Sequence, residues 1–418
     1  MSRGRGETPA RLGDHAEAGP QQGRLGRAGR PLEVFVVSRV VLWIAVVFAW
    51  LLFESYGNPR FANAPERVRD MGYVLEVLAQ WDVAWFLGIA REGYSYAEGS
   101  VAYFPLYPVV VGVVGRVLAG HYVLAGVAVS LAACAVAFVL LDHLARLKLG
   151  DEVARRSVLY LAVFPTSLFL GLPYSESLYL ALSVGAFLAI ERGSLPASGV
   201  IAGLAMLTRT AGFALLPALL LLAWRAGHRR RMAWLLVAPA IAALYPLYLW
   251  RTEGSPFAFL DAQRTGWGRE LSELGPLEGV GRGLNAGLQG IRQVIAGPDA
   301  AGLYWNWARD TTPGRAAMLS IFYALTLLLL LVLTVIAWKH LGAPYGLFCA
   351  LSLALPLSSP TTDWPLLSLP RFALGMFPVF IALGSLRVSP ERHRILLATS
   401  TLLLGVVVCQ WATYYFVA

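Results

Sequence analysis

Acidic and basic side chains are scarce in this chain of 418 residues, so each one near an apolar stretch is a candidate for chemistry. Asp82 lies between two tryptophans in Trp81-Asp82-Val83-Ala84-Trp85. A carboxylate partly desolvated by indoles is a stronger base, so Asp82 is a candidate general base. The alternative interpretation is an acidic residue in the first turn of a helix, where the helix dipole favours it.

Glu176 is the second acidic candidate, and it follows Leu172-Pro173-Tyr174-Ser175. The prolines of this region end one helix, so Ser175 is a candidate cap for the next helix, with Glu176 in its first turn. The functional alternative is that Glu176 faces the same compartment as Asp82 and positions a substrate. Asp363 is a further charged residue on the face predicted to be outer.

Two arginines interrupt apolar sequence: Arg209 in Leu207-Thr208-Arg209-Thr210, and Arg371 in Leu369-Pro370-Arg371-Phe372. A guanidinium in such a stretch needs an anion or another acceptor nearby. Two of them on one face indicate binding of a phosphate or an anionic lipid head group. Snorkelling of each side chain to the membrane interface is the alternative.

Aromatic and polar residues also gather in the segment that holds Gln263, Trp267 and Arg269. Indole faces with amide and guanidinium groups suit sugar binding by stacking and hydrogen bonds, although an ordinary extracytoplasmic loop has a similar composition. Trp85 and Trp267 are the candidate stacking faces. The turn Tyr103-Phe104-Pro105 is typical of anchoring at the membrane interface.

The composition indicates the class of fold that must hold these residues in place. Apolar residues make up 57% of the chain and charged residues 14%, where a soluble domain carries about 25% charged residues. This excludes an ordinary soluble protein and a disordered one, and predicts an all-α polytopic membrane protein. The three cysteines lie in apolar runs, without the spacing of a disulfide framework or a zinc site.

Residues 1–33 are rich in Gly, Arg and Pro, and we predict a disordered basic cytoplasmic arm there. Residues 34–418 form a single transmembrane domain of about 11 spans with large outer loops at 54–121 and 251–315. Within the first loop, the spacing of Trp81 and Trp85 predicts an amphipathic interfacial helix. Segment 104–118 holds two prolines and is predicted to be re-entrant rather than a crossing. The predicted spans are 34–53, 122–141, 157–172, 176–191, 197–207, 211–224, 232–250, 316–338, 341–357, 367–386 and 395–417.

The net charge of +9 is explained by topology. With the N-terminus cytoplasmic, the short basic clusters at 142–156 and 225–231 both fall inside, as the positive-inside rule requires. Counting 104–118 as a crossing would place the first of these clusters outside. The basic charge therefore marks orientation and needs no nucleic acid as a partner.

The candidate motifs, in this order, resemble the PIG-V family, the GPI second-mannose transferases, and its bacterial relatives in the GT-C superfamily of glycosyltransferases. Thr210, Phe372 and Phe86 depart from the family, in which Pro, Tyr and Tyr are frequent at these places. The motifs that carry the resemblance are Trp81-Asp82 through Gly93-Tyr94, Phe104-Pro105-Leu106-Tyr107-Pro108, Phe164-Pro165-Thr166-Ser167, Tyr174-Ser175-Glu176-Ser177, Leu207-Thr208-Arg209, Gln263 with Trp267-Gly268-Arg269, and Ser368-Leu369-Pro370-Arg371-Phe372.

The resemblance implies a GT-C-like helical enzyme that takes mannose from a polyprenyl-phosphate-mannose donor on the non-cytoplasmic face. It also implies that Asp82 is the catalytic acidic residue of the first outer loop. We therefore expect an inverting mannosyltransferase in which Asp82 is the base, Arg209 and Arg371 hold the phosphate, and Glu176 positions a substrate. Further binding candidates come from the same motifs: Trp81, Trp85, Tyr94, Tyr174, Gln263, Trp267 and Arg269.

One phosphate can be held by arginines alone, so we expect no metal and no other cofactor. The expected partners are the donor lipid, a glycan, glycolipid or protein acceptor, and membrane lipids. The high Ala, Gly and Arg content with few Lys is typical of a GC-rich bacterium, and we expect a multi-pass protein of the bacterial plasma membrane with an extracytoplasmic active site. Two alternatives stay open: a lipid or solute transporter or flippase, because broken helices with intramembrane charges are typical of that class, and a non-catalytic subunit of the same fold.

Overall fold

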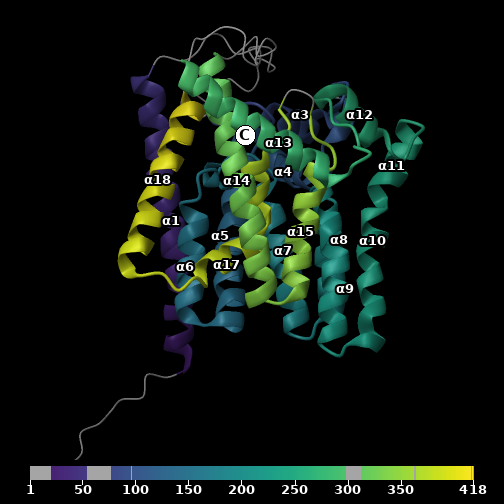
Figure 1. Ribbon diagram of the computed structural model, residues 1–418. Coiled ribbons are helices and arrows are strands. Elements are labelled where there is room, and N and C mark those ends of the chain that lie inside the picture. Colours follow the sequence, from purple (N-terminus) through teal and green to yellow (C-terminus); the bar gives the residue numbers. More distant parts are fainter. Residues whose placement is uncertain are drawn as a thin grey trace, which may run out of the picture.

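The computed structural model describes residues 20–53, 77–95, 97–297, 312–361, 364–415 and 417. Asp363 and parts of both predicted outer loops lie outside these residues. All regular structure in the described ranges is helical, as predicted (Figure 1). The α-helices are α1 (Pro20–Leu52), α3 (Val83–Glu92), α4 (Leu106–Val117), α5 (Tyr122–Leu149), α6 (Asp151–Ala162), α7 (Glu176–Glu191), α8 (Leu195–Met206), α9 (Leu215–Arg225), α10 (Val237–Ala242), α11 (Leu244–Thr252), α12 (Ala258–Trp267), α13 (Pro276–Ala296), α14 (Pro313–His340), α15 (Ala343–Leu357), α16 (Leu369–Phe372), α17 (Phe377–Gly384) and α18 (Pro390–Ala412).

Short 3-10 segments join several of these helices: Gly93–Ser95, Ser100–Ala102, Ser167–Leu170, Thr210–Ala214, Arg229–Leu236 and Ala373–Gly375. In the described ranges, five helical segments are long and apolar enough to cross a membrane: Gly29–Leu52, Tyr122–Leu149, Arg229–Thr252, Pro313–His340 and Pro390–Ala412. The chain is therefore a polytopic helical membrane protein. The count of eleven spans and the re-entrant course of 104–118 stay predictions.

Two predicted spans differ in detail from the structure. The segment 157–172 is not one helix, because α6 ends at Ala162 ahead of Pro165 and is followed by a 3-10 turn. The segment 367–386 is divided among α16, a 3-10 turn and α17, with prolines at the start of both helices. Proline lacks the amide hydrogen and disfavours helical backbone in the residue before it, so both segments break where the prolines stand.

The N-terminal arm also differs from the prediction over part of its length. Helix α1 begins at Pro20, so residues 20–33 extend the helix, while residues 1–19 lie outside the described residues. Helix propagation from an apolar span costs far less than nucleation, which explains how a segment rich in Gly and Arg continues it.

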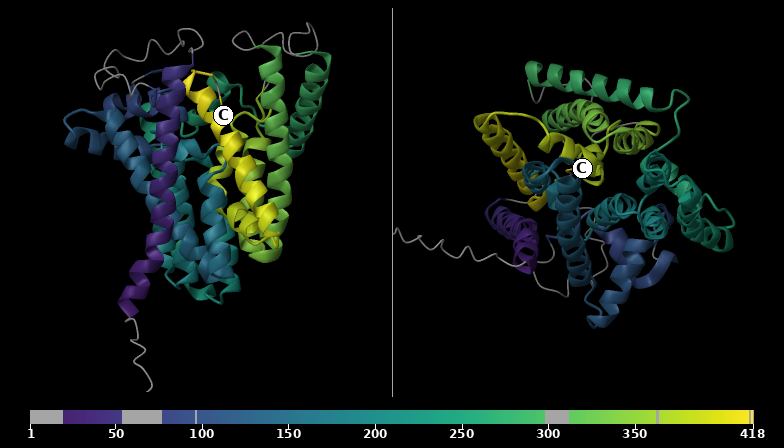
Figure 2. Two further views of the ribbon diagram at one scale, coloured as in Figure 1. Left: turned by 90° about the vertical axis from the view of Figure 1, so that its left-hand side faces the viewer. Right: turned by 90° about the horizontal axis from the view of Figure 1, so that it is seen from below.

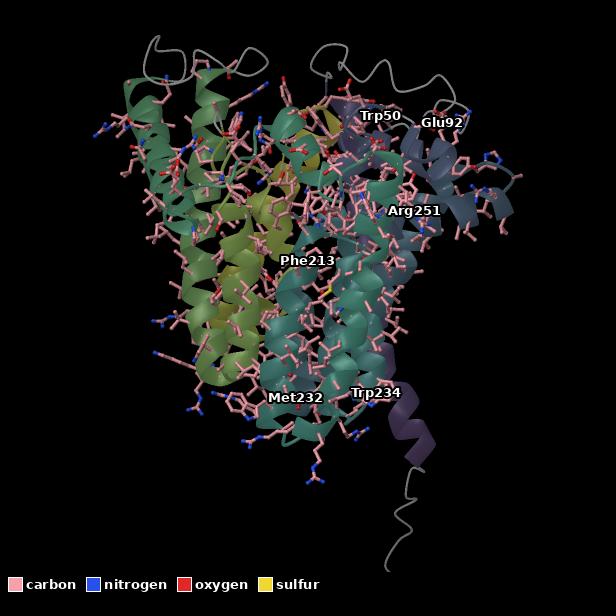
Figure 3. The ribbon with its side chains drawn as sticks, turned by 90° about the vertical axis from the view of Figure 1, so that its right-hand side faces the viewer. Trp50, Glu92, Phe213, Met232, Trp234 and Arg251 are labelled. Carbon is pink, nitrogen blue, oxygen red and sulfur yellow. The ribbon has the colours of Figure 1, made fainter. Side chains whose placement is uncertain are left out.

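The long helices run between two ends of the body. Short helices gather at one end, and a basic segment lies at the other. Helices α3, α4, α12 and α13 gather at the upper end of Figure 1, and Figure 2 shows the long helices α1, α14 and α18 reaching the same end. In Figure 3, Met232 and Trp234 lie at the lower end, while Glu92 and Arg251 lie at the upper end. The basic residues 229–231 therefore lie at the end opposite to α3.

The lengths of the central helices leave room for a site at the upper end. Helix α8 has 12 residues and α7 has 16, whereas α14 has 28. At about 1.5 Å per residue, α8 rises only about 18 Å, and about 20 residues are needed to cross a bilayer. The short helices therefore end inside the body, and a cavity lies above them.

Candidate active site

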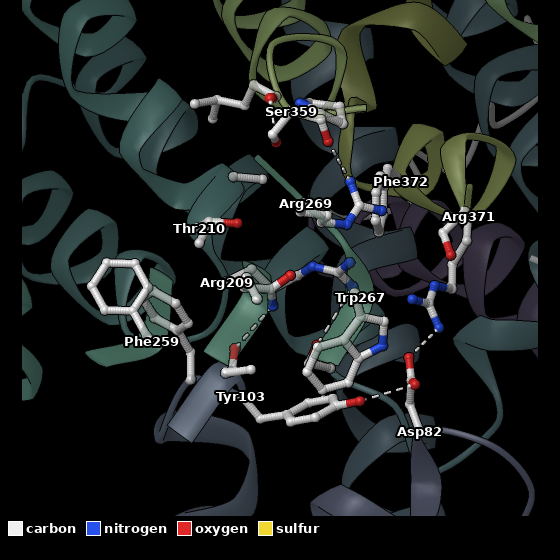
Figure 4. A pocket seen from close by; sticks show the side chains of 18 of the residues that line it. Asp82, Tyr103, Arg209, Thr210, Phe259, Trp267, Arg269, Ser359, Arg371 and Phe372 are labelled. Atoms are coloured by element: carbon white, nitrogen blue, oxygen red, sulfur yellow. Dashed lines mark hydrogen bonds and ion pairs between the residues drawn. The ribbon is translucent and has the colours of Figure 1, made fainter. Parts of the chain in front are cut away.

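A cavity of about 790 Å³ is lined by residues from both halves of the sequence (Figure 4). Most of the predicted site residues meet there: Trp81, Asp82, Tyr174, Glu176, Arg209, Gln263, Trp267, Arg269 and Arg371. Trp85 and Tyr94 are not among the lining residues. Segments separated by almost 300 positions in the sequence therefore converge on one site.

The charged residues of the cavity lie at the ends of short helical elements. Asp82 precedes α3 and occupies its N-cap position, and Glu176 is the first residue of α7. Arg209 follows α8 and precedes the 3-10 turn at Thr210, while Arg371 lies within the four-residue α16. Because these elements end inside the body, their terminal side chains reach the cavity.

Both oxygens of the Asp82 carboxylate have partners. Arg371 Nη1 lies 2.7 Å from Oδ2, and the Tyr103 hydroxyl donates to Oδ1 at 3.0 Å (Figure 4). The side chain of Asp82 is 24% exposed, so it faces the cavity while it is held from two sides. Burial, followed by the nearby Asp82, raises the pKa of Tyr103 well above its usual value, so the hydroxyl keeps its proton.

Glu176 holds two arginines together at the floor of the cavity. Its Oε1 forms ion pairs with Arg209 Nη1 and with Arg371 Nε, the latter at 3.3 Å. The Glu176 side chain is only 2% exposed, and a buried charge is tolerated when it is paired in this way. Ser175 occupies the predicted N-cap position, but its hydroxyl makes no capping bond and instead accepts from Arg209 at 3.5 Å.

Arg269 adds a third guanidinium that has no acidic partner among the described residues. It donates to the main-chain oxygens of Ser359 at 3.4 Å and Leu367 at 3.1 Å. Burial, and then the nearby Arg371, lower the pKa of Arg269 to about 10, so it remains a cation at neutral pH. The inner part of the cavity therefore carries one positive charge in excess.

The ring of Phe372 contacts all three arginines of this cationic group. The guanidinium carbons of Arg209, Arg269 and Arg371 lie 5.2, 5.7 and 5.6 Å from its ring centre. Such placement over an aromatic face stabilises a cation. The hydroxyl of a tyrosine, which is frequent here in the resembling family, is not needed for this contact.

Three aromatic side chains, Tyr103, Trp85 and Trp267, pack against one another beside Asp82. The Tyr103 ring stacks on Trp85, with centres 5.6 Å apart, and meets Trp267 edge-on at 5.5 Å. Tyr94 donates to the main-chain oxygen of Tyr103 at 2.7 Å, and Gln263 donates to that of Ala102 at 3.4 Å. Trp85 and Tyr94 thus support Tyr103 from behind, while Trp267 presents its ring to the cavity.

The backbone is strained beside both members of the Asp82–Arg371 pair. Trp81 and Ser368 have positive φ angles of 56° and 66°, in the left-handed region that non-glycine residues rarely adopt. Such conformations cost about 1–3 kcal/mol each and concentrate at functional sites. The surrounding packing must hold these two segments in place.

Sequence reasoning missed the roles of Tyr103 and Phe372. An aromatic, proline-rich turn such as the one that holds Tyr103 is typical of membrane anchoring, and Phe372 differs from the resembling family only by its missing hydroxyl. The position of Tyr103 in the same predicted outer loop as Asp82 was the available signal. Nothing in the local sequence around Phe372 indicates a ring that contacts three arginines.

Comparisons with known proteins match the N-terminal part of this chain. The model of the family described as mannosyltransferase (PIG-V) matches residues 32–223, which include Asp82, Tyr103, Glu176 and Arg209. The GPI alpha-1,6-mannosyltransferase 2 of Cricetulus griseus is 30% identical over 169 residues, which make up 38% of this chain and 34% of that protein. The protein of the same name from Mus musculus is 30% identical over 177 residues, 40% of this chain and 36% of that protein. The matches thus span about a third of the relatives' length, and the resemblance to the PIG-V family is confirmed.

Proposed function

We propose that this chain, which matches the PIG-V mannosyltransferase family over residues 32–223, is a membrane glycosyltransferase that transfers mannose from a polyprenyl-phosphate-mannose donor. The observation that carries the proposal is the convergence of Asp82, Glu176, Arg209 and Arg371 on one cavity. The partly exposed carboxylate of Asp82 lies beside a cationic group there, which is the arrangement needed to deprotonate an acceptor and to hold a phosphate leaving group.

The charge of the inner part of the cavity, which holds Asp82, Glu176, Arg209, Arg269 and Arg371, supports a donor with one phosphate. Three guanidiniums and two carboxylates leave one excess positive charge, which balances the single negative charge of a phosphodiester. At the rim, Arg264 and Glu270 form an exposed pair at 3.6 Å and neutralise each other, and Asp261 is exposed. A diphosphate donor would bring additional negative charge that the described side chains do not balance.

The flank of the cavity supports a lipid-linked donor. Phe213, Leu260, Leu271 and Leu355 line the cavity and are 44%, 45%, 80% and 42% exposed. Phe213 lies on the side of the body between its two ends, as Figure 3 shows. Exposed apolar side chains that continue from a charged pocket suit a ligand with a charged head and a hydrocarbon tail.

In the proposed reaction, the acceptor hydroxyl oxygen attacks the anomeric carbon of mannose while the bond from that carbon to the phosphate oxygen breaks. Asp82 takes the hydroxyl proton, and polyprenyl phosphate leaves with the bonding electrons. Arg209 and Arg371 stabilise the charge that develops on the phosphate.

The state of Glu176 supports inversion at the anomeric carbon. A retaining double displacement needs a second carboxylate that is free to act as a nucleophile beside the sugar. Glu176 is buried and held by two guanidiniums, and Asp261 lies exposed at the rim. A single displacement needs only the base Asp82. Trp267 offers a stacking face for a sugar beside that base.

The proposed location is a bacterial plasma membrane, with the N-terminus cytoplasmic and the cavity toward the extracytoplasmic face. Segments 142–156 and 225–231, which hold the basic clusters, adjoin turns at the end opposite α3, and this supports the orientation. The acceptor is a glycan, glycolipid or protein on that face. A transporter is less well supported, because its charged groups should gather near the middle of the bilayer between two related halves.

The proposal is tested with membranes that contain the expressed chain, an acceptor extract, and radiolabelled mannose supplied either on polyprenyl phosphate or on a nucleotide. Transfer from the lipid donor alone is the expected result. Transfer only from the nucleotide sugar, when synthesis of the lipid donor is blocked, would refute the donor assignment. Movement of labelled lipid across the bilayer without transfer would favour the transporter alternative.

A further inference from the structure

In the arrangement that the structure shows, both oxygens of the candidate base Asp82 have a partner. A general base directs an oxygen lone pair at the proton it accepts, and a paired guanidinium opposes the loss of negative charge that this entails. Here Oδ1 accepts from Tyr103 and Oδ2 is paired with Arg371 at 2.7 Å. Each oxygen keeps a second lone pair, but protonation of Asp82 would remove the counter-charge of Arg371, so release of this ion pair favours acceptance of a proton.

Tyr103 is the partner that is fixed in place. Its ring is stacked on Trp85 and contacts Trp267, and its main-chain oxygen accepts from Tyr94. Its hydroxyl keeps its proton at neutral pH, as the burial described above requires. Oδ1 therefore keeps its hydrogen bond, and Oδ2 is the oxygen whose partner can change.

Arg371 is the partner that a donor can engage. Its guanidinium is shared between Asp82 and Glu176, and it lines the cavity beside Arg209 and Arg269. A phosphate that enters this group offers Arg371 a further anionic partner, whose oxygens accept from a guanidinium as those of a carboxylate do. Glu176 keeps its hold on the Nε side while the Nη1 side changes partner.

We propose that Arg371 exchanges partners, from Oδ2 of Asp82 to the phosphate of the donor, so that donor binding removes the ion pair that opposes protonation of Asp82. This inference rests on the proposed function. The exchange makes binding ordered, with the donor ahead of productive acceptor binding. It also assigns Tyr103 as a positioning residue that selects Oδ2 as the base atom.

The exchange is consistent with the charge balance of the reaction. As Asp82 takes the proton from the acceptor hydroxyl it becomes neutral, and the leaving polyprenyl phosphate gains one negative charge. Asp82 then no longer attracts Arg371, whereas the leaving polyprenyl phosphate carries two negative charges and attracts it more strongly. Each step of proton transfer therefore strengthens its hold on the leaving group.

The test is donor affinity in an inactive variant. Because the Asp82 carboxylate competes with the phosphate for Arg371, Asp82→Asn should bind polyprenyl-phosphate-mannose about tenfold more tightly than the wild type. Asp261→Asn is the matched control, since Asp261 lines the same cavity but forms no ion pair among the described residues. It removes an equal charge, and its affinity should stay within about twofold of the wild type.

Binding is measured by equilibrium titration of the labelled lipid on the purified chain in nanodiscs, and thermal melting checks that each variant is folded. Equal tightening in both variants would show a general charge effect and overturn the exchange, as would unchanged or weaker binding by Asp82→Asn. A double-mutant cycle adds an independent measurement: in an Arg371→Gln background, Asp82→Asn should no longer tighten binding. Persistence of the tightening there would also overturn the exchange.

The same experiment separates the inference from the proposed function. If the wild-type chain transfers mannose from the lipid donor but Asp82→Asn binds it no more tightly, the partner exchange is wrong and the function stands. If the wild-type chain neither binds the lipid donor nor transfers from it, the proposed function is wrong.

Discussion

The Glu176→Gln substitution probes the centre of the charged group. Glu176 is 2% exposed and pairs with both Arg209 and Arg371, so the variant leaves two guanidiniums without their shared counter-charge. Removing one partner of a buried ion pair costs about 3–5 kcal/mol. We expect the purified variant to melt at a clearly lower temperature than the wild type.

A phosphate ligand should restore part of that loss, because it brings negative charge to the same arginines. Polyprenyl phosphate at 100 times its dissociation constant stabilises the wild type by about 2.7 kcal/mol. If it binds the variant tenfold more tightly, the same concentration gives about 4.1 kcal/mol. The rise in melting temperature on adding polyprenyl phosphate should therefore be larger for Glu176→Gln than for the wild type.

Glu191→Gln supplies the matched control within the same helix. Glu191 ends α7, pairs with Lys148 at 2.8 Å and accepts from Tyr345 at 2.7 Å, but it does not line the cavity. We expect this variant to lose stability as well, and to gain only the wild-type amount from polyprenyl phosphate. Differential scanning fluorimetry in detergent measures all three proteins with and without the lipid.

Two results would refute this reasoning. If Glu176→Gln melts like the wild type, Glu176 is not a buried clamp for the two arginines. If polyprenyl phosphate raises the melting temperature equally in all three proteins, the phosphate does not contact the arginines that Glu176 holds.

Three further predictions concern single residues. Arg371→Lys should lower kcat/KM for the lipid donor about 100-fold in initial-rate assays, because lysine lacks the planar fork, and an unchanged rate would contradict the phosphate assignment. Tyr103→Phe should lower kcat about tenfold at every pH between about 6 and 9, since the raised pKa of the hydroxyl keeps it a donor throughout; a loss confined to high pH would contradict this. Gly279→Ala should destabilise the protein by about 1–3 kcal/mol, because the added methyl group meets the main chain of Leu357, while Gly281→Ala in the same helix meets open space and should stabilise it by about 1 kcal/mol; melting temperatures that move in the same direction would contradict the packing of α13.

The class of fold could be predicted from the sequence because apolar composition and run length report directly on a bilayer. Helix breaks were harder to predict. The run 367–386 is apolar enough to be a span, yet Pro370 and Pro378 divide it, and that division is what places Arg371 in the cavity. Hydropathy averages over such a break, so the sequence predicts one continuous span where the structure has two short helices joined by a 3-10 turn.

The charged members of the site were predictable because a charge in an apolar stretch is costly and therefore conspicuous. Asp82, Glu176, Arg209 and Arg371 were all found in this way, and the structure brings them together. Their pairing was not predictable, because it depends on contacts between segments far apart in the sequence. The same reason hid Phe372, whose ring is unremarkable until three guanidiniums surround it.

The most direct test of the central claim is mannose transfer by the purified single chain in nanodiscs, with labelled polyprenyl-phosphate-mannose and an acceptor extract. The wild type should release one polyprenyl phosphate for each mannose transferred, and Asp82→Asn should reduce transfer by at least about 100-fold while still binding the donor. Asp261→Asn, tested in parallel, shows whether loss of any cavity carboxylate has the same effect. Undiminished transfer by Asp82→Asn would contradict the account.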